Sequence, residues 1–325
     1  FLLVVISLLT NILLIVWIGL KGVSILIALA LSNFAATVFI VVKEKIWKYI
    51  SIRKCSLIRL KELLSYSLPL IPNAISWWIV NTSDRLLIMF FLGSSSNGIY
   101  AAANKIPTIY TTIYNVFNLA WTESVARSIN DKDKEQFING MLVKSYKFFG
   151  CLCIGIISCM SLLFDFLIGY EYSDAYNHIY ILMIAIFINS ICAMYGGIFT
   201  GYKKSKVIAS TTIIGAIANI VINFACIKYI GLYAASISTL ISYLLIMIMR
   251  AYEANKLMKL SVPIKFFLRL GLVGAVVSYG YFRCEAVQNL LILVMVGIWS
   301  FVENRKMIFA FCTAAMSKVR GGDKA

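Results

Sequence analysis

The sequence has little charge and almost no histidine. Charged residues make up 14% of its 325 residues, whereas soluble domains carry about 25%. Hydrophobic residues reach 61% and the mean hydropathy is +0.87. These values exclude a soluble globular protein. The single histidine, His178, excludes His-rich metal sites and most His-dependent catalytic triads.

The eight cysteines do not have the paired spacing of a zinc site. Most lie in apolar segments, and Cys151 and Cys153 fall on different faces of one predicted helix. No segment has the pattern of a phosphate-binding loop or a nucleophile elbow. We therefore expect no catalytic residue, no metal and no cofactor, and a protein that is not an enzyme.

What the sequence has in abundance is long apolar runs, each close to the roughly 20 residues that a helix needs to cross a bilayer. A single segment can cross the bilayer only as a helix, because lipid offers no hydrogen-bond partner to a free backbone N–H or C=O group. The runs predict an all-α, polytopic integral membrane protein of about ten transmembrane helices. The predicted helices cover residues 1–18, 22–42, 64–92, 98–123, 142–168, 178–199, 207–227, 232–250, 266–282 and 289–302.

The distribution of positive charge supports this count. The net charge of +16 could indicate a nucleic-acid partner, but its lysines and arginines gather on alternate connections between the predicted helices. That alternation is the positive-inside pattern of a membrane protein, so we expect no nucleic acid. It predicts that both ends of the chain face the cytoplasm. The basic connection 43–62 is either a surface amphipathic helix or a solvated loop.

Polar side chains follow one face of two predicted helices. In residues 98–123 this face carries Tyr100, Asn104, Thr108, Thr111, Asn115 and Asn118, with Lys105 and Glu123 at its edge. In residues 64–92 it carries Asn73, Asn81 and Asp84, with Arg85 beside them. A polar stripe on a spanning helix faces water or protein rather than lipid. The two stripes therefore predict a hydrated cavity.

Arg85 and Lys105 are the charges that most require an explanation. An intramembrane charge costs about 2.5–3.5 kcal/mol on insertion scales, so it needs a compensating partner. Our hypothesis is that both face the cavity and attract an anion such as phosphate. The alternative is that they extend to the membrane interface, or pair with Asp84 or Glu123.

A weak internal repeat suggests two halves. Residues 11–25 resemble residues 219–237, which lie six predicted helices later. This spacing fits two parallel repeats of six helices. The alternative is a chance similarity between apolar segments. The sequence opens at Phe1, inside an apolar run and without a methionine. We therefore expect an N-terminally truncated chain that lacks four helices of a first lobe.

One segment carries a family resemblance. The run from Tyr66 to Asn73 (YSLPLIPN) resembles the seventh helix of bacterial polysaccharide flippases, of the O-antigen and capsule type. The later elements Asp84-Arg85, 91–93 (FLG), 98–100 (GIY) and 103–107 (ANKIP) resemble that family as well. These flippases belong to the multidrug/oligosaccharidyl-lipid/polysaccharide exporter superfamily.

The resemblance implies a fold of two six-helix lobes with two further helices. Its domains would be 1–42, the last two helices of the N-terminal lobe; 43–63, a cytoplasmic basic linker; 64–250, the C-terminal lobe; 251–302, two additional helices; and 303–325, a cytoplasmic tail. It also implies a place in the bacterial cytoplasmic membrane and a substrate, an oligosaccharide linked to undecaprenyl pyrophosphate. Besides the lipid bilayer, a polysaccharide polymerase and a chain-length regulator are the partners that it suggests.

In this family picture, Arg85 and Lys105 meet the pyrophosphate and the stripe of amides and hydroxyls binds sugar. Asp84 and Glu123 are the candidates for coupling a proton or a sodium ion. Two rival functions remain: a multidrug antiporter of the same fold, for which an acidic cavity is expected, and a membrane-embedded polysaccharide polymerase, for which a large outward loop is expected.

Overall fold

The computed structural model describes residues 2–17, 19, 22–49 and 56–321, and all regular secondary structure in these ranges is helical. Residues 50–55 of the predicted linker and 322–325 of the predicted tail lie outside the described residues, as do residues 1, 18, 20 and 21. The chain divides into two compact units, Phe1–Leu63 and Leu64–Ala325.

Eight helical segments of the described residues are long and apolar enough to cross a membrane. The two predicted helices that do not meet this criterion are the first, which is short, and the fourth, whose polar stripe lowers its hydropathy. The structure thus has the helical architecture of a multi-pass membrane protein. The helices are α1 (Leu2–Val16), α2 (Val23–Lys43), α3 (Leu57–Ser67), α4 (Leu70–Ala103), α5 (Lys105–Ser128), α6 (Lys134–Leu167), α7 (Ala175–Gly201), α8 (Ser205–Ile230), α9 (Tyr233–Leu257), α10 (Ile264–Arg283) and α11 (Ala286–Gly321).

The first unit is built on the pairing of α1 with α2. The buried face of α2 carries Ser24, Ala28 and Ser32, spaced four residues apart and each at most 1% exposed. Small residues at this spacing let two helix backbones approach closely, which is how membrane helices pack without a hydrophobic driving force. A short 3₁₀ helix, Ile46–Lys48, follows α2.

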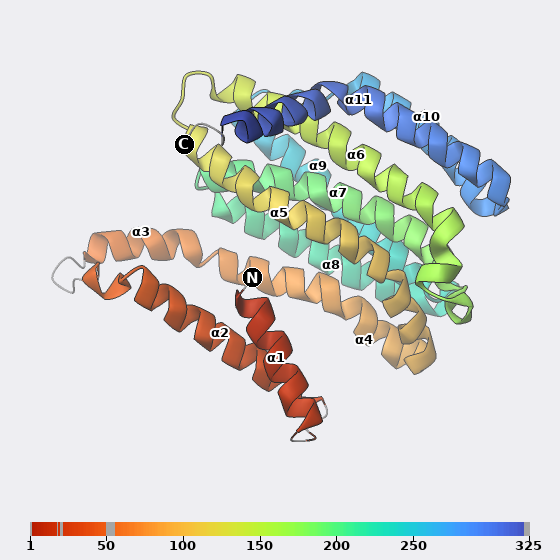
Figure 1. The fold of residues 1–325 in the computed structure, drawn as a ribbon, viewed down its shortest axis with the longest axis horizontal. Helices are drawn as coiled ribbons and strands as arrows, with labels where there is room; N and C mark the ends of the chain where they lie inside the picture. Colours follow the sequence, from red (N-terminus) through yellow and green to blue (C-terminus); the bar gives the residue numbers. More distant parts are fainter. Residues whose placement is uncertain (1, 18, 20–21, 50–55, 322–325) are drawn as a thin grey trace. The chain divides into compact units, whose positions relative to one another are not determined.

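The second unit holds α4 to α11. Helix α7 packs against α5 and α9, α8 packs against α4 and α9, and α6 packs against α10 and α11 (Figure 1). On α7, Gly197 permits the closest approach, because a Cβ there would lie 2.6 Å from Nε1 of Trp121. That indole donates a 2.9 Å hydrogen bond to the carbonyl of Met194, which fixes α5 on α7.

Glycine and proline set the breaks in this unit. Gly93 adopts φ 88° and ψ 179°, a conformation open to glycine, and interrupts α4. The segment 93–98, predicted as a connection, is therefore a kink followed by helix up to Ala103. A second break falls at Asn104, just before Pro107, whose missing N–H is tolerated in the first turn of α5. The predicted helix 98–123 is therefore interrupted near its proline, and its first residues belong to α4.

Two more predicted boundaries are wrong. Helix α9 does not end at residue 250 but continues to Leu257, because no breaker interrupts the sequence before Pro263. Helix α11 continues beyond residue 302 to Gly321, so most of the predicted tail is helical. The first correction matters for function, because it places Arg250 inside α9 rather than at the last position of the predicted helix.

Candidate functional site

A polar cavity of about 380 Å³ lies among α4, α5, α7, α8 and α9. Thr111, Asn115, Asn118 and Thr122 bring the stripe of α5 to its wall, because their spacing of four, three and four residues keeps them on one helix face. Its other lining residues are Leu70, Asn73, Trp77, Tyr114, Ile186, Asn189, Ser190, Ala193, Gly196, Gly197, Thr200, Ile208 and Arg250.

Two residues that line this cavity carry a buried hydrogen-bond acceptor without a protein partner. The Oδ1 atoms of Asn73 and Asn189 are shielded from solvent and have no hydrogen-bond partner among the described residues. By contrast, Asn118 Oδ1 accepts the hydroxyl of Tyr114 at 3.0 Å, and Thr111 Oγ1 donates to the carbonyl of Pro107 at 2.9 Å. A buried polar atom without a partner costs free energy, so the two free amide oxygens suit a hydroxyl-bearing ligand or water.

Arg250 on α9 supplies the positive charge of the cavity, and the sequence prediction missed it. Its side chain is fully enclosed, at 2% exposure. The guanidinium donates to the Cys192 carbonyl at 2.8 Å, to Thr212 Oγ1 at 2.9 Å, to Thr211 Oγ1 at 3.1 Å and to the Ile208 carbonyl at 3.4 Å. All four acceptors are neutral. No carboxylate of the described residues pairs with this guanidinium, so its charge is not compensated by the protein.

The cavity has room for this cation because residue 196 is a glycine. A Cβ on Gly196 would lie 3.2 Å from Arg250 Nη1, tighter than ordinary contact. Among the described residues that line the cavity, Arg250 carries the only formal charge. The signal in the sequence is that Arg250, the last residue of the predicted helix 232–250, is followed by seven more residues that are compatible with a helix.

A second polar site surrounds Asp84, which is 3% exposed on α4. Its carboxylate accepts hydrogen bonds from Tyr100 Oη at 3.0 Å, Asn223 Nδ2 at 2.7 Å and Thr239 Oγ1 at 2.7 Å. Tyr100, predicted as a cavity residue, thus belongs to this cluster. The amide of Asn219 joins it through a 3.3 Å bond to Thr239 Oγ1. Helices α4, α8 and α9 therefore meet at one buried carboxylate.

The Asp84 cluster also contains an acceptor without a donor. Asn223 Oδ1 is buried and has no hydrogen-bond partner among the described residues. Carboxylate, amide and hydroxyl oxygens are the ligands of hard cations. The residues present therefore fit a small monovalent cation, or a proton on Asp84. Asp84 follows Trp77 of the polar cavity by seven residues, about 10 Å along α4, so one helix connects the two sites.

The structure does not bring every predicted site residue to the cavity. Arg85, Lys105, Asn81 and Thr108 are exposed and are not among its lining residues. Asn81 Nδ2 and Thr108 Oγ1 bond to backbone carbonyls of their own helices, at 2.8 and 2.7 Å. Asn104, half-buried, donates to the carbonyl of Tyr100 at 2.9 Å. The first four instead lie on the outside of the second unit.

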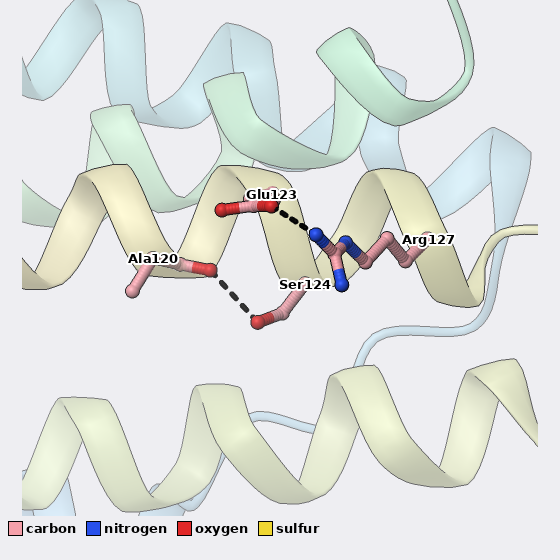
Figure 2. Close-up of polar contacts among 4 residues, drawn as sticks. All are labelled: Ala120, Glu123, Ser124 and Arg127. Carbon is pink, nitrogen blue, oxygen red and sulfur yellow. Dashed lines mark hydrogen bonds and ion pairs between the residues drawn. The ribbon is translucent and has the colours of Figure 1, made fainter. Parts of the chain in front are cut away.

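Glu123 lies at the far end of α5, where Figure 2 shows it paired with Arg127 one turn later on the same helix. Both side chains are largely exposed, at 62% and 80%. Ser124 beside them donates to the carbonyl of Ala120 at 2.8 Å. The polar groups of this turn are therefore paired within α5 itself. Glu123 is not part of the buried Asp84 cluster.

Comparisons with known proteins agree with this fold. A family model of polysaccharide biosynthesis proteins matches residues 2–122. A probable low-salt glycan biosynthesis flippase of Haloferax volcanii is 23% identical over 263 residues, which cover 77% of this chain and 54% of that protein. The chain therefore spans about half the length of this curated relative.

The solved structure of a lipid II flippase in an inward closed conformation has the same fold. The superposition has a TM-score of 0.65 at 17% identity and covers 93% of this chain and 67% of the other. At this identity the likeness concerns the fold alone. The motifs around residues 66–107, the family match and this fold agree with one another. Over residues 2–122 the chain is similar to polysaccharide biosynthesis proteins, and over most of its length it has the fold of a lipid II flippase.

Proposed function

We propose that the protein moves a lipid-linked oligosaccharide across the bacterial cytoplasmic membrane by alternating access, without covalent chemistry. The observation that carries the proposal is the polar cavity among α4, α5, α7, α8 and α9. Its free amide oxygens suit sugar hydroxyls, and Arg250 suits an anionic group of the substrate.

The substrate that we propose is an undecaprenyl-pyrophosphate-linked repeat unit of a surface polysaccharide such as O-antigen or capsule. The family supports a glycan substrate, and an apolar cavity of about 630 Å³ among α5, α6 and α11 supports a lipid-linked one. A multidrug antiporter is disfavoured, because a cavity for cationic drugs needs acidic groups and Arg250 would repel such substrates.

We propose the domain division that follows from this function. Residues 64–250, which contain α4 to most of α9, act as one six-helix lobe, and residues 251–302 contribute two additional helices. Helices α1 and α2 belong to the other lobe, residues 43–63 link the two, and residues 303–325 follow the last transmembrane helix. The basic connections face the cytoplasm, as the positive-inside rule requires.

Asp84 is the ion-coupling residue of this proposal. It is buried, it joins three helices, and an unpaired amide oxygen lies beside it. Binding of a proton or sodium ion there would change the charge at the junction of α4, α8 and α9, and so bias their packing. Glu123 supports coupling less well, since Arg127 already pairs with it at an exposed site.

The experiment that tests this function replaces Lys105 by alanine in the full chain. We expect the loss of surface polysaccharide at an unchanged protein level in the membrane, because in this proposal the exposed Lys105 reaches the substrate in another conformation of the transport cycle. Lys206→Ala is the matched control, because Lys206 is also exposed but lies at the start of α8. Normal polysaccharide in Lys105→Ala would remove this residue from the mechanism. Lipid-linked repeat units that still reach the outer leaflet without the protein would refute the flippase assignment.

A further inference from the structure

A second charged cavity, of about 690 Å³, opens between α6, α10 and α11. Its charged lining residues come from three helices and are mostly basic. They are Lys144, Lys147, Arg269, Arg305 and Lys306, with Glu303 as the acidic member. Five cations against one carboxylate leave a charge of +4 on this lining. We call these six residues the basic pocket.

Glu303 orients two of the cations. Its side chain is 6% exposed, and its Oε1 and Oε2 atoms lie 2.8 Å from Arg269 Nη2 and 3.2 Å from Lys147 Nζ. One carboxylate that holds two cations side by side cannot neutralise both. The remaining members, Lys144, Arg305 and Lys306, are exposed and have no ion-pair partner in the described part of the chain. The arrangement is a pre-formed receptor for an anion.

The depth of the basic pocket matches a lipid headgroup. Lys147 precedes Leu167, the last residue of α6, by 20 residues, or about 30 Å of helix. Glu303 follows Ala286, the first residue of α11, by about 26 Å. Since the hydrocarbon core is about 30 Å thick, both lie near its boundary on the side that carries the basic connections. Lipid phosphates lie at this height.

The surface around the basic pocket faces lipid. Leu268 and Leu272 of α10 are 65% and 70% exposed, and Ile298 and Val302 of α11 are 62% and 54% exposed. Large apolar side chains this exposed on spanning helices contact acyl chains in a bilayer. A lipid can therefore place its chains on α10 and α11 while its phosphate reaches the basic pocket.

We propose that the basic pocket binds the phosphate headgroup of an anionic phospholipid of the cytoplasmic leaflet. The inference rests on the membrane orientation given under the proposed function. It assigns a ligand other than the transported substrate, because the charged residues of the basic pocket line neither the polar cavity nor the apolar cavity among α5, α6 and α11. The cavity around the basic pocket shares only Asn304 and Met307 with that apolar cavity. Basic pockets between helices on the cytoplasmic side recognise anionic headgroups in this way.

The test measures lipid binding to the full chain in detergent, by native mass spectrometry with phosphatidylglycerol and with phosphatidylcholine. The variant is Lys144→Gln with Lys306→Gln, since both lysines are exposed and their loss leaves the Glu303 pairs intact. The matched control is Lys132→Gln with Lys206→Gln, which removes the same charge from exposed sites outside the basic pocket.

We expect the wild type to prefer phosphatidylglycerol over phosphatidylcholine. The double variant should bind phosphatidylglycerol about 25-fold more weakly, about fivefold for each lysine near the surface. The control should keep the wild-type preference. An equal loss in variant and control would mean that only overall charge matters and would overturn the proposal. A variant that keeps full preference would overturn it as well.

Two further arms separate the phosphate sources. Inorganic pyrophosphate at millimolar concentration should not displace phosphatidylglycerol, whereas complete displacement would indicate a site for free phosphate. A third outcome is that undecaprenyl pyrophosphate competes for the basic pocket while phosphatidylglycerol and phosphatidylcholine bind equally well. That outcome would assign the basic pocket to the transported substrate and overturn the proposal. Binding is measured without transport. If the wild-type protein moved no lipid-linked oligosaccharide in a separate assay, the proposed function would be rejected, but the lipid-binding result would still stand.

Discussion

Replacing Arg250 by methionine removes the charge of the polar cavity at little structural cost. The two carbonyls that it contacts, of Cys192 and Ile208, lie within helices α7 and α8 and belong to their backbone ladders. The hydroxyls of Thr211 and Thr212 donate to helix carbonyls of their own. Arg250→Met therefore orphans no buried donor, and methionine is flexible enough to fill the space of the arginine stem.

The expected magnitudes differ between stability and function. Arg250→Met loses the stabilisation of four hydrogen bonds to neutral acceptors, but it also removes the cost of burying a charged guanidinium. Because these two contributions oppose each other, we expect the free energy of unfolding to change by no more than about 1.5 kcal/mol. An anion that loses its buried cation partner should lose at least about 2 kcal/mol of binding, which is about 30-fold in affinity. Function should therefore fall far more than stability.

The assay compares the wild type with Arg250→Met and Arg250→Lys. Thermal unfolding of the purified proteins gives stability, and surface polysaccharide in a strain that lacks the native gene gives function. Arg250→Lys keeps the charge but has fewer donors, so it should recover part of the polysaccharide. Arg250→Met should melt near the wild-type temperature and produce almost none.

The opposite pattern would refute this reasoning. If Arg250→Met melts much lower and its polysaccharide falls only in proportion to the folded protein, then Arg250 is a structural residue that ties α9 to α7 and α8. Full polysaccharide in Arg250→Met would show that the substrate does not use this charge. Either result would remove the anion from the polar cavity.

Three other perturbations test the remaining sites. Asp84→Asn keeps the shape of the side chain but removes its charge. Transport by this variant should no longer depend on a sodium or proton gradient. An unchanged dependence would exclude Asp84 as the coupling residue. Gly197→Ala should destabilise the protein by about 2–3 kcal/mol in thermal unfolding, because the new methyl group meets the ring of Trp121, whereas Gly140→Ala, with open space around it, should not. Asn115→Cys, in a background without accessible cysteines, should react with a water-soluble maleimide, and resistance in the intact protein would argue that the polar cavity is closed to water.

Hydropathy and charge order were enough to predict the helical membrane architecture. Backbone groups cannot stay unpaired in lipid, so an apolar run of sufficient length has one available structure, and the runs around α6, α7 and α8 are of that kind. The α5 stripe was also predictable, since periodicity places Thr111, Asn115 and Asn118 on one face whatever the neighbours are.

The tertiary structure decided which polar groups meet. Asp84 and Asn223 are 139 residues apart in the chain, and only the packing of α4 on α8 brings them to 2.7 Å. Arg250 has the same residue type as the basic residues of the loops; its burial depends on α9 continuing past it and on Gly196 leaving space for the guanidinium.

The sequence by itself thus determined local properties: helix formation, the polar face of α5 and the breaks at Gly93 and near Pro107, where backbone sterics act within a few residues. Whether Lys105 is exposed while Arg250 is enclosed depends on contacts between helices far apart in the chain. The physical reason is that a side chain's burial is a property of its neighbours, and those are set by packing rather than by the residue's own identity.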